Sequence, residues 1–412
     1  MPSIGTVLER RRGIGPGFDM LRVGLAFSVV GWHSFHIAQG EPHQLAQLHF
    51  FWFPGYAILS MFFALSGFLI TASAMRLSLG NFIINRGLRI IPALLVEVML
   101  SALILGAIFT TLPLSEYFRS DGFWRYFGNV AGLVSLTLPG VFGTNPDHSV
   151  NVSLWTIPYE IGCYVLIAGL IIFRCLHRPR TVLALCVAFG VIAVGICLIE
   201  PDLTLASALD PRNIFIGNGS RLFISFLLGI AIYLYRFDIA YSHRSAAACL
   251  LFCVVIAAVG PLPGVLLNVL VTPALVYLTA YLGVSDLPEL PLFNKGDYSY
   301  GIYLYGYPLQ QTIVALWPYQ GNVFLLFVLS APLITAFAMF SWHAIEYPIL
   351  KLRRRFSFIA DRRTQAAEQG GLQPAIFVTD TSAAIDGPAC AVQPGRDDPG
   401  MLRAIPVTPP AR

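Results

Sequence analysis

The feature that most constrains the fold is a series of apolar stretches, most of them long enough to cross a bilayer. A helix needs about 20 apolar residues to span the hydrocarbon core, and its backbone must satisfy its own hydrogen bonds there. The chain is 56% hydrophobic and only 12% charged, which is typical of a bundle surrounded by lipid. The sequence therefore predicts an all-α, polytopic transmembrane bundle of about ten spans. The expected spans are residues 18–38, 52–75, 91–112, 154–173, 181–200, 213–235, 245–260, 264–283, 298–318 and 322–346.

The basic residues indicate which ends of the spans face the cytoplasm, because cytoplasmic segments carry an excess of Lys and Arg. With the N-terminus inside, only Arg119, Arg125 and Arg212 fall on the outer side, so we expect both termini in the cytoplasm. The net charge of +4 is modest and the basic residues form no single stripe, so membrane lipids are expected partners and nucleic acid is not. The inner basic residues are Arg10, Arg11, Arg12, Arg76, Arg86, Arg89, Arg174, Arg178, Arg180, Arg236, Arg244, Lys295, Lys351, Arg353, Arg354 and Arg355.

This pattern divides the chain into three parts. Residues 1–17 form a cytoplasmic N-terminal segment, residues 18–355 the transmembrane domain, and residues 356–412 a tail that is expected to be disordered. The first span carries charge and lacks a cleavage site, so we expect it to be retained in the mature protein. The seven cysteines show no CxxC spacing and no metal-binding motif is present, so we expect no metal site.

Two ionisable residues lie inside the first span, where hydrocarbon should exclude both. Arg22 and His33 are 11 residues apart, which on a helix places them on one face, about 20° apart in azimuth and roughly 16 Å apart along the axis. Ionisable residues at bilayer depth normally face the bundle interior and have a function. Arg22 and His33 are therefore the first candidates for catalysis.

A second candidate group is the Arg86 and Arg89 pair, which we expect in a cytoplasmic loop after the second span. Residues at i and i+3 are neighbours on a helical turn, so two guanidinium groups there could bind one phosphate-bearing group. The alternative, that both are ordinary positive-inside arginines, is equally consistent with the loop alone.

Glu160 is the third candidate, because it lies in apolar sequence near the outer start of the span at 154–173. Its depth below the outer boundary is similar to that of His33. Glu160 could orient His33 or bind an acceptor hydroxyl, but it could also be a packing contact to Arg221 or to a tyrosine.

The chain resembles the acyltransferase family 3 of integral membrane acyltransferases, which O-acetylate bacterial surface sugars. The resemblance runs from about residue 18 to residue 355 and rests on six motifs in order. These are Arg-x10-His (Arg22, His33), MFFALSGFLIT (Met61 to Thr71), Arg-x-x-Arg (Arg86, Arg89), SLWTIPYE (Ser153 to Glu160), SYGIYLYGYPL (Ser299 to Leu309) and IEYP (Ile345 to Pro348).

The resemblance implies a multi-pass enzyme of the bacterial inner (plasma) membrane. It would move an acyl group, usually acetyl, from acyl-CoA on the cytoplasmic side to a hydroxyl of a glycan or lipid-linked sugar outside. By analogy His33 is the essential histidine, Arg22 its motif partner, and Arg86 and Arg89 part of the CoA-phosphate site. A neutral histidine could take the proton of the attacking hydroxyl, or it could form an acyl-histidine intermediate.

The oxyanion formed in acyl transfer needs hydrogen-bond donors, for which Trp155, Tyr300 or Arg22 could serve. The chain departs from the family at Gly306, where many relatives have a histidine, so no role of that histidine can be carried over. Glu346 and Pro348 are expected to end the last helix and to pair charge at the inner interface.

A different class of protein is also consistent with these residues. A transporter or flippase of a lipid-linked sugar could have Arg22, His33 and Glu160 along its path. Against it, the sequence has no repeated half and no matching pair of broken helices. His33-dependent consumption of a thioester distinguishes the two, because only the enzyme requires it. The oligomeric state is not indicated by the sequence.

Overall fold

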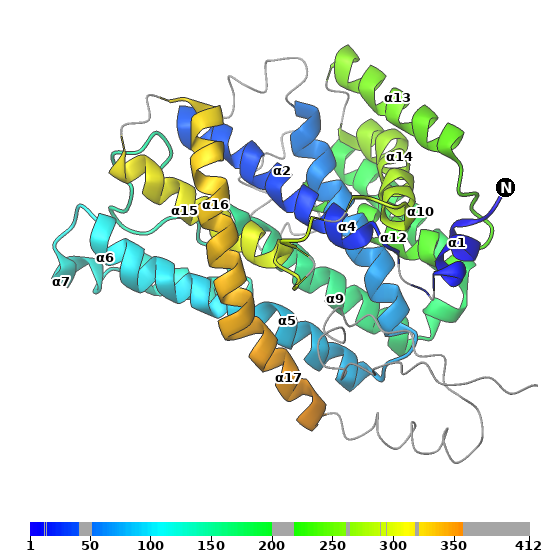
Figure 1. Ribbon diagram of the computed structural model, residues 1–412, viewed down its shortest axis with the longest axis horizontal. Coiled ribbons are helices and arrows are strands. Elements are labelled where there is room, and N and C mark those ends of the chain that lie inside the picture. Colours follow the sequence, from blue (N-terminus) through cyan, green and yellow to red (C-terminus); the bar gives the residue numbers. More distant parts are fainter. Residues whose placement is uncertain are drawn as a thin grey trace, which may run out of the picture.

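The computed structural model of the protein is a bundle of helices (Figure 1), and no strand occurs among the residues that it describes. The described residues are 1–11, 13, 15–40, 52–199, 218–260, 264–288, 290–293, 295–317 and 321–356. The predicted all-α class is confirmed. The expected tail beyond Phe356 and the basic positions Arg12 and Arg212 lie outside the described residues.

Within the described residues, a helix overlaps each expected span. The long helices are α2 (Phe18–Gln39), α4 (Trp52–Ala74), α5 (Leu79–Met99), α9 (Ile157–Ile172), α10 (Pro179–Ile199), α12 (Asn218–Leu234), α13 (His243–Val259), α14 (Gly264–Val284), α15 (Ser299–Leu316) and α16 (Val323–Ser341). The shorter ones are α1 (Ile4–Arg10), η1 (Leu100–Leu105), α6 (Gly106–Phe109), α7 (Leu114–Tyr117), α8 (Asp121–Tyr126), η2 (Phe127–Ala131), η3 (Val152–Thr156), η4 (Cys175–His177), η6 (Trp342–Glu346) and α17 (Tyr347–Phe356).

Five continuous helical stretches in the described part of the chain are long and apolar enough to cross a membrane. They are Trp52–Ala74, Leu79–Phe109, Val152–Ile172, Leu267–Val284 and Val323–Lys351. Three shorter apolar helices accompany them, within α10, α12 and α13. The membrane character is therefore supported, while the count of ten spans and the sides of the termini stay predictions.

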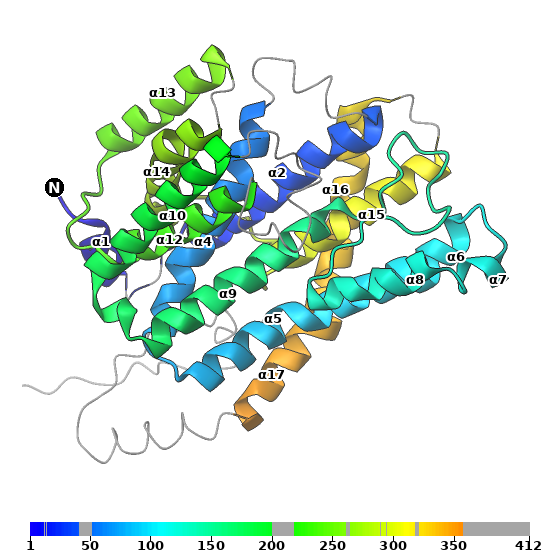
Figure 2. The same cartoon turned by 180° about the vertical axis from the view of Figure 1, so that it is seen from behind.

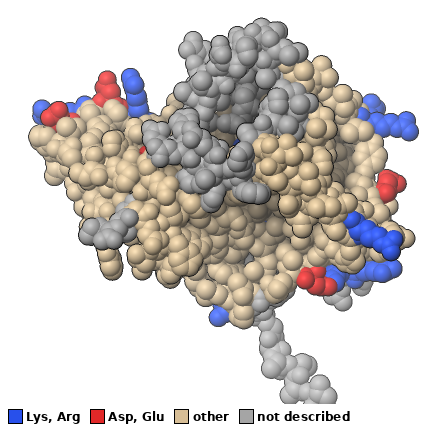
Figure 3. All heavy atoms as spheres, turned by 90° about the horizontal axis from the view of Figure 1, so that it is seen from above, with Lys and Arg blue, Asp and Glu red and all other residues tan. Residues whose placement is uncertain are grey.

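The distribution of surface charge agrees with a membrane environment. On the face shown in Figure 3, most of the visible Lys, Arg, Asp and Glu side chains lie toward the left and right edges, and few lie on the tan surface between them. Many large apolar side chains are more than half exposed, among them Val165, Phe173, Val191, Leu251 and Phe324. Lipid, not water, is the solvent that makes such exposure favourable.

The segment with Arg86 and Arg89 is helical, so the expected loop is wrong. Helix α5 begins at Leu79, 12 residues before the expected span, because Ser78 accepts a hydrogen bond from the Asn81 N–H at the helix N-terminus. Phe82 is fully buried and fixes this first turn in the bundle. The helix continues through Pro92 into the π-helical segment η1, and Figure 2 shows it beside α9.

The last helix also extends further than expected. It does not end at Pro348, because the π-helical segment η6 connects α16 to α17, which runs to Phe356. Pro348 is the second residue of α17, at a place where the backbone has already left the regular α pattern.

Small residues allow close contact between the central helices. A Cβ atom on Gly67 of α4 would lie 2.1 Å from the carbonyl oxygen of Phe226, and one on Gly229 of α12 would lie 2.2 Å from that of Ala64. Helix backbones approach closely at such small residues in membranes, where the hydrophobic effect does not drive association. Helix α15 is held in a similar way between α2 and α16, through Gly306 and Gly301.

Candidate active site

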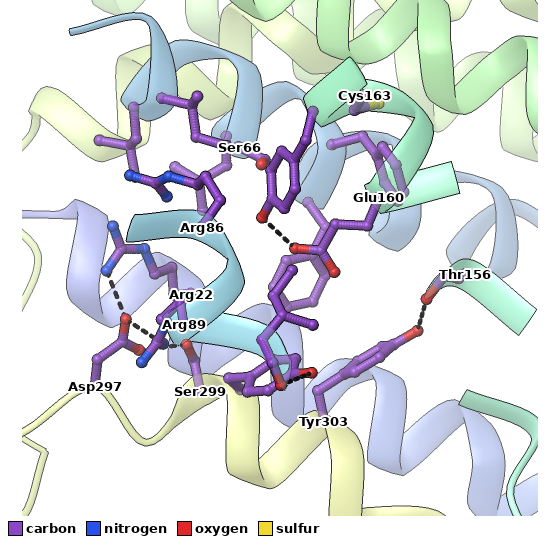
Figure 4. Close-up of a pocket in the computed structure, with 18 of the residues that line it drawn as sticks. Arg22, Ser66, Arg86, Arg89, Thr156, Glu160, Cys163, Asp297, Ser299 and Tyr303 are labelled. Carbon is purple, nitrogen blue, oxygen red and sulfur yellow. Dashed lines mark hydrogen bonds and ion pairs between the residues drawn. The ribbon is translucent and has the colours of Figure 1, made fainter. Parts of the chain in front are cut away.

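A cavity of about 210 Å³ lies where α2, α4, α5, α9 and the start of α15 meet. One part of its wall is charged, and its charged lining residues are Arg22, Arg86, Arg89, Glu160 and Asp297. The polar lining residues are Ser66, Thr156, Ser299, Tyr164, Tyr300 and Tyr303. The remaining wall is apolar and consists of Leu59, Phe62, Phe63, Leu65, Leu69, Ile70, Ile90 and Cys163. Figure 4 shows how the charged and polar side chains converge.

Asp297 connects two of the three arginines. Its Oδ2 accepts from Arg89 Nη2 at 2.7 Å and from Arg22 Nη1 at 3.1 Å, and its Oδ1 accepts from the Ser299 hydroxyl at 2.6 Å. Burial by itself would raise the pKa of Asp297, but the charges of Arg89 and Arg22 and the hydrogen bonds from Ser299 lower the pKa to about 2. Asp297 is therefore ionised at every physiological pH.

Arg89 has a second carboxylate partner, Glu346. Arg89 Nη1 donates to Glu346 Oε2 at 3.2 Å, and Ser341 Oγ donates to Glu346 Oε1 at 3.2 Å. Glu346 is only 1% exposed and is the last residue of η6, so it lies inside the bundle. The expectation that Glu346 pairs charge is met, but its partner is a cavity arginine 257 residues earlier.

Arg86 differs from its neighbour one turn along the helix. Its Nη2 donates to Ser73 Oγ at 3.4 Å, and its guanidinium lies 5.9 Å from the centroid of the Phe82 ring. Its Nε is buried and has no hydrogen-bond partner among the described residues.

Glu160 Oε1 accepts from the Tyr164 hydroxyl at 2.7 Å, which matches the tyrosine contact that the sequence left open. Arg221, the other partner considered for Glu160, lies elsewhere. It is 7% exposed, and its guanidinium is 4.8 Å from the centroid of the Tyr56 ring. Tyr56 in turn donates to Asn268 at 3.0 Å. This contact belongs to the α4, α12 and α14 side of the bundle.

His33 is not among the residues that line the cavity in the described part of the chain. It is 8% exposed, and its ring packs edge-to-face against Tyr307 with centroids 4.9 Å apart. Tyr307 donates its hydroxyl to Asp147, whose backbone carbonyl accepts from Gln311 Nε2 at 2.8 Å. The proposed histidine thus lies in a polar cluster further along α2.

The structure brings five of the seven sequence-derived candidates to one cavity. They are Arg22, Arg86, Arg89, Glu160 and Tyr300. Trp155 is not one of its lining residues, because its ring packs against Tyr159 at 5.6 Å between centroids. The three arginines could hold a phosphate-bearing ligand. No group of His, Cys, Asp and Glu that could hold a metal ion occurs among the described residues.

Asp297 is the site residue that sequence reasoning missed. It stands two residues before Ser299, where the SYGIYLYGYPL motif begins. Its position just before this motif was the signal in the sequence that could have indicated Asp297 as a site residue. Its partnership with Arg22, 275 residues earlier, depends on the fold.

The fold and the cavity define an integral-membrane protein whose helices enclose a cationic site with an apolar wall. Among known families, an acyltransferase domain matches residues 16–343, and the chain belongs to this family, acyltransferase family 3. The resemblance seen in the motifs is confirmed. The protein is a membrane acyltransferase of the O-acetyltransferase type.

Three curated relatives support this assignment. An O-acetyl transferase of Shigella phage Sf6 is 25% identical over 347 residues, which are 80% of this chain and 94% of the relative. Nodulation protein 10 of Rhizobium leguminosarum bv. viciae is 28% identical over 396 residues, or 88% of this chain and 100% of the relative. The putative peptidoglycan O-acetyltransferase YrhL of Bacillus subtilis is 27% identical and matches 81% of this chain and 54% of the relative. No solved structure matches the chain.

Proposed function

We propose that the protein transfers an acetyl group from acetyl-CoA on the cytoplasmic side to a hydroxyl of a glycan or lipid-linked sugar on the outer side of the bacterial inner membrane. The observation that carries the proposal is the cavity, in which three arginines meet an apolar wall between membrane helices. Acyl-CoA has the matching chemistry, since it combines phosphate groups with a long, uncharged pantetheine arm. The family and the names of its relatives make O-acetylation the reaction.

The expected topology sets the direction of transfer. Arg86 and Arg89 lie near the start of α5, beside the basic segments that the positive-inside rule assigns to the cytoplasm. His33 lies 11 residues beyond Arg22 on α2, which is roughly 16 Å further toward the predicted outer side. A pantetheine arm extended from the arginines along α2 would bring the thioester toward His33.

His33 is the proposed general base. A sugar hydroxyl is a weak nucleophile at neutral pH, and a neutral imidazole within hydrogen-bond reach would accept its proton as the oxygen attacks the thioester carbonyl. The C–S bond then breaks, CoA leaves as a thiolate, and the proton on His33 can neutralise that sulfur. The ring of His33 is buried and packs against Tyr307, which fixes its direction inside the bundle.

Other residues of the cavity have proposed supporting roles. Arg22 and Tyr300 line the charged wall and are proposed to contact the donor there. Glu160 lines the same cavity, whereas His33 does not, so the proposed role of Glu160 at the acceptor hydroxyl requires an acceptor that reaches from His33 into the cavity. Trp155 keeps its proposed role only if the acceptor reaches the outer start of α9. An acyl-histidine intermediate on His33 is the alternative to direct transfer, and it predicts a labelled histidine after brief mixing with acetyl-CoA.

The acceptor is proposed to be a surface glycan. The relatives include two proteins named as peptidoglycan O-acetyltransferases, one of them as putative, which supports a glycan acceptor. Family membership favours the enzyme over the transporter, which needs no thioester.

The test follows the acyl group itself. Bacteria with and without the protein would be grown, and their surface glycans compared by mass spectrometry for O-acetyl groups. Inverted membrane vesicles given ¹³C-acetyl-CoA from the cytoplasmic face should place label in the glycan fraction. Unchanged surface acetylation together with unlabelled vesicles would contradict the proposal, and export of a sugar in its place would support the transporter.

A further inference from the structure

We propose that the two arginines of the Arg-x-x-Arg pair have different tasks, of which Arg86 contacts a phosphate group of the donor and Arg89 is a positioning residue held by Asp297. This inference rests on the proposed function, because it takes acyl-CoA as the donor. It assigns Asp297 a role that the motif itself does not indicate. The following contacts carry it.

The guanidinium of Arg89 is already paired with two carboxylates. Its two terminal nitrogens donate to carboxylates of two separate elements, Asp297 before α15 at 2.7 Å and Glu346 in η6 at 3.2 Å. Its Cζ atom also lies 5.3 Å and 5.7 Å from the ring centroids of Trp342 and Tyr300. A phosphate that took the place of Glu346 at Arg89 would leave this carboxylate, which is 1% exposed, without its cationic partner and with only the hydrogen bond from Ser341 among the described residues.

Asp297 neutralises Arg22 as well. Arg22 Nη1 lies 3.1 Å from Asp297 and 3.2 Å from Asp19, so the two carboxylates balance much of its charge. The charges of Arg89 and Arg22 lower the pKa of Asp297, so the carboxylate that pairs with both is in its ionised form. Figure 4 shows Asp297 on the side of Arg22 and Arg89, apart from Arg86.

Arg86 alone among the three keeps its charge available. No ion pair within 4.0 Å joins it to a carboxylate of the described residues, and its one side-chain hydrogen bond is the 3.4 Å contact to Ser73. Its Nε is buried without a partner. A half-buried guanidinium with free donors on the wall of a cavity is suited to an anion that binds there, and phosphate matches its forked geometry.

The two tasks can be separated with two donors. Acetyl-CoA has phosphates, whereas S-acetylpantetheine has the same thioester and arm without any phosphate. Arg86→Ala should raise KM for acetyl-CoA by about 10- to 100-fold, as expected for a lost charge-assisted contact. The same variant should leave KM for S-acetylpantetheine unchanged. Arg89→Ala and Asp297→Asn should lower kcat for both donors by the same factor, because they disturb the position of the helices and not the phosphate.

Conservative variants and a control make the test specific. Arg86→Lys should recover much of the acetyl-CoA affinity, since an ammonium group can also bind phosphate. Arg89→Lys should not recover activity, because one ammonium cannot hold two carboxylates in fixed directions. Arg178→Ala, at an exposed position of the expected cytoplasmic side, should change neither KM nor kcat with either donor. Monodisperse elution and a wild-type melting temperature would identify the folded variants.

The outcomes distinguish this inference from the proposed function. A phosphate-selective loss in Arg89→Ala, alone or equal to that in Arg86→Ala, would overturn the division of tasks while the enzyme remains established. Selective loss in Arg86→Ala alone would support it. If the wild-type protein cleaves neither thioester in the presence of acceptor membranes, the proposed function itself fails, and the inference fails with it.

Discussion

The ring of His33 packs edge-to-face against the ring of Tyr307, with centroids 4.9 Å apart and ring planes at 77°. Tyr307 is 1% exposed and donates its hydroxyl to Asp147, so it connects α2 and α15 to the segment before η3. A residue held by both a ring contact and a hydrogen bond can fix the direction of its neighbour. Tyr307 therefore orients the histidine that we propose as the base.

Removal of the Tyr307 ring should slow acetyl transfer. Tyr307→Ala deletes a ring contact worth about 1 kcal/mol and leaves His33 free to turn, and small displacements of a catalytic group can cost up to about 100-fold in rate. We expect kcat to fall about 10- to 100-fold, whereas Tyr307→Phe, which keeps the ring, should lose less. Initial rates with acetyl-CoA would measure both. A folded Tyr307→Ala protein with the wild-type rate would show that the ring does not position His33.

The stability of the protein should depend on pH through Asp147. This residue lies between the membrane helices α6 and α9, and burial raises its pKa, although hydrogen bonds from Ser149 partly oppose the shift. A raised carboxyl pKa means that the folded protein binds the proton more tightly than the unfolded chain. The favourable contribution is present below the ordinary carboxyl pKa and is lost as the pH rises through the raised value. Ionised Asp147 is thus a cost at pH 7.

Asp147→Asn tests this sign. The amide keeps an Oδ1 acceptor for the Ser149 N–H, which lies 3.0 Å from Asp147 Oδ1, and its Nδ2, in the place of Oδ2, donates to the Tyr307 hydroxyl, so that this bond reverses its direction. We expect the melting temperature at pH 7 to rise by about 2 °C relative to wild type, and the difference to vanish toward pH 4. Asp121→Asn, at an exposed position, is the control. Thermal unfolding between pH 4 and pH 8 measures the effect, and a lower melting temperature for Asp147→Asn at pH 7 would refute the sign.

The contact between α4 and α12 should not tolerate a methyl group. Gly229→Ala would place a Cβ 2.2 Å from the carbonyl oxygen of Ala64, so the two helices must separate. Overpacking of this kind costs about 1 to 3 kcal/mol, and we expect a lower melting temperature. Gly169→Ala is the matched control, because a Cβ at this helical glycine meets no atom within 4 Å. Equal melting temperatures for the two variants would contradict the close contact.

Much of the fold was predictable because lipid imposes strong rules on sequence. An apolar stretch of span length must be helical, which located α4, α9 and α16 from hydropathy alone. The charged candidates were predictable for the same reason, since Arg22 and Glu160 stand out in apolar sequence. Boundaries were less predictable at α5, because the polar first turn with Ser78 and Asn81 resembles a loop.

The pairing of charges was not predictable. Whether Arg89 binds a ligand or a carboxylate depends on Asp297 and Glu346, which lie 208 and 257 residues later. No local pattern specifies such contacts, because they arise only when α5, the start of α15 and η6 pack together. The spacing of Arg22 and His33 predicted their separation along α2, but the contact of His33 with Tyr307 was not predictable, for a similar reason. The spacing of two residues on one helix shows that they share a face. It does not show which other helices pack against that face near each residue.

The most direct test of the account is the rate of acetyl-CoA thioester cleavage by purified protein supplied with acceptor membranes. Wild type would be compared with His33→Ala and with His36→Ala, a matched control one turn further along α2 whose ring packs against Trp32. We predict that His33→Ala loses cleavage by at least about 100-fold while it elutes and melts as wild type, and that His36→Ala stays within a few-fold of wild type. Wild-type turnover by a folded His33→Ala protein would contradict the central claim that His33 is the base.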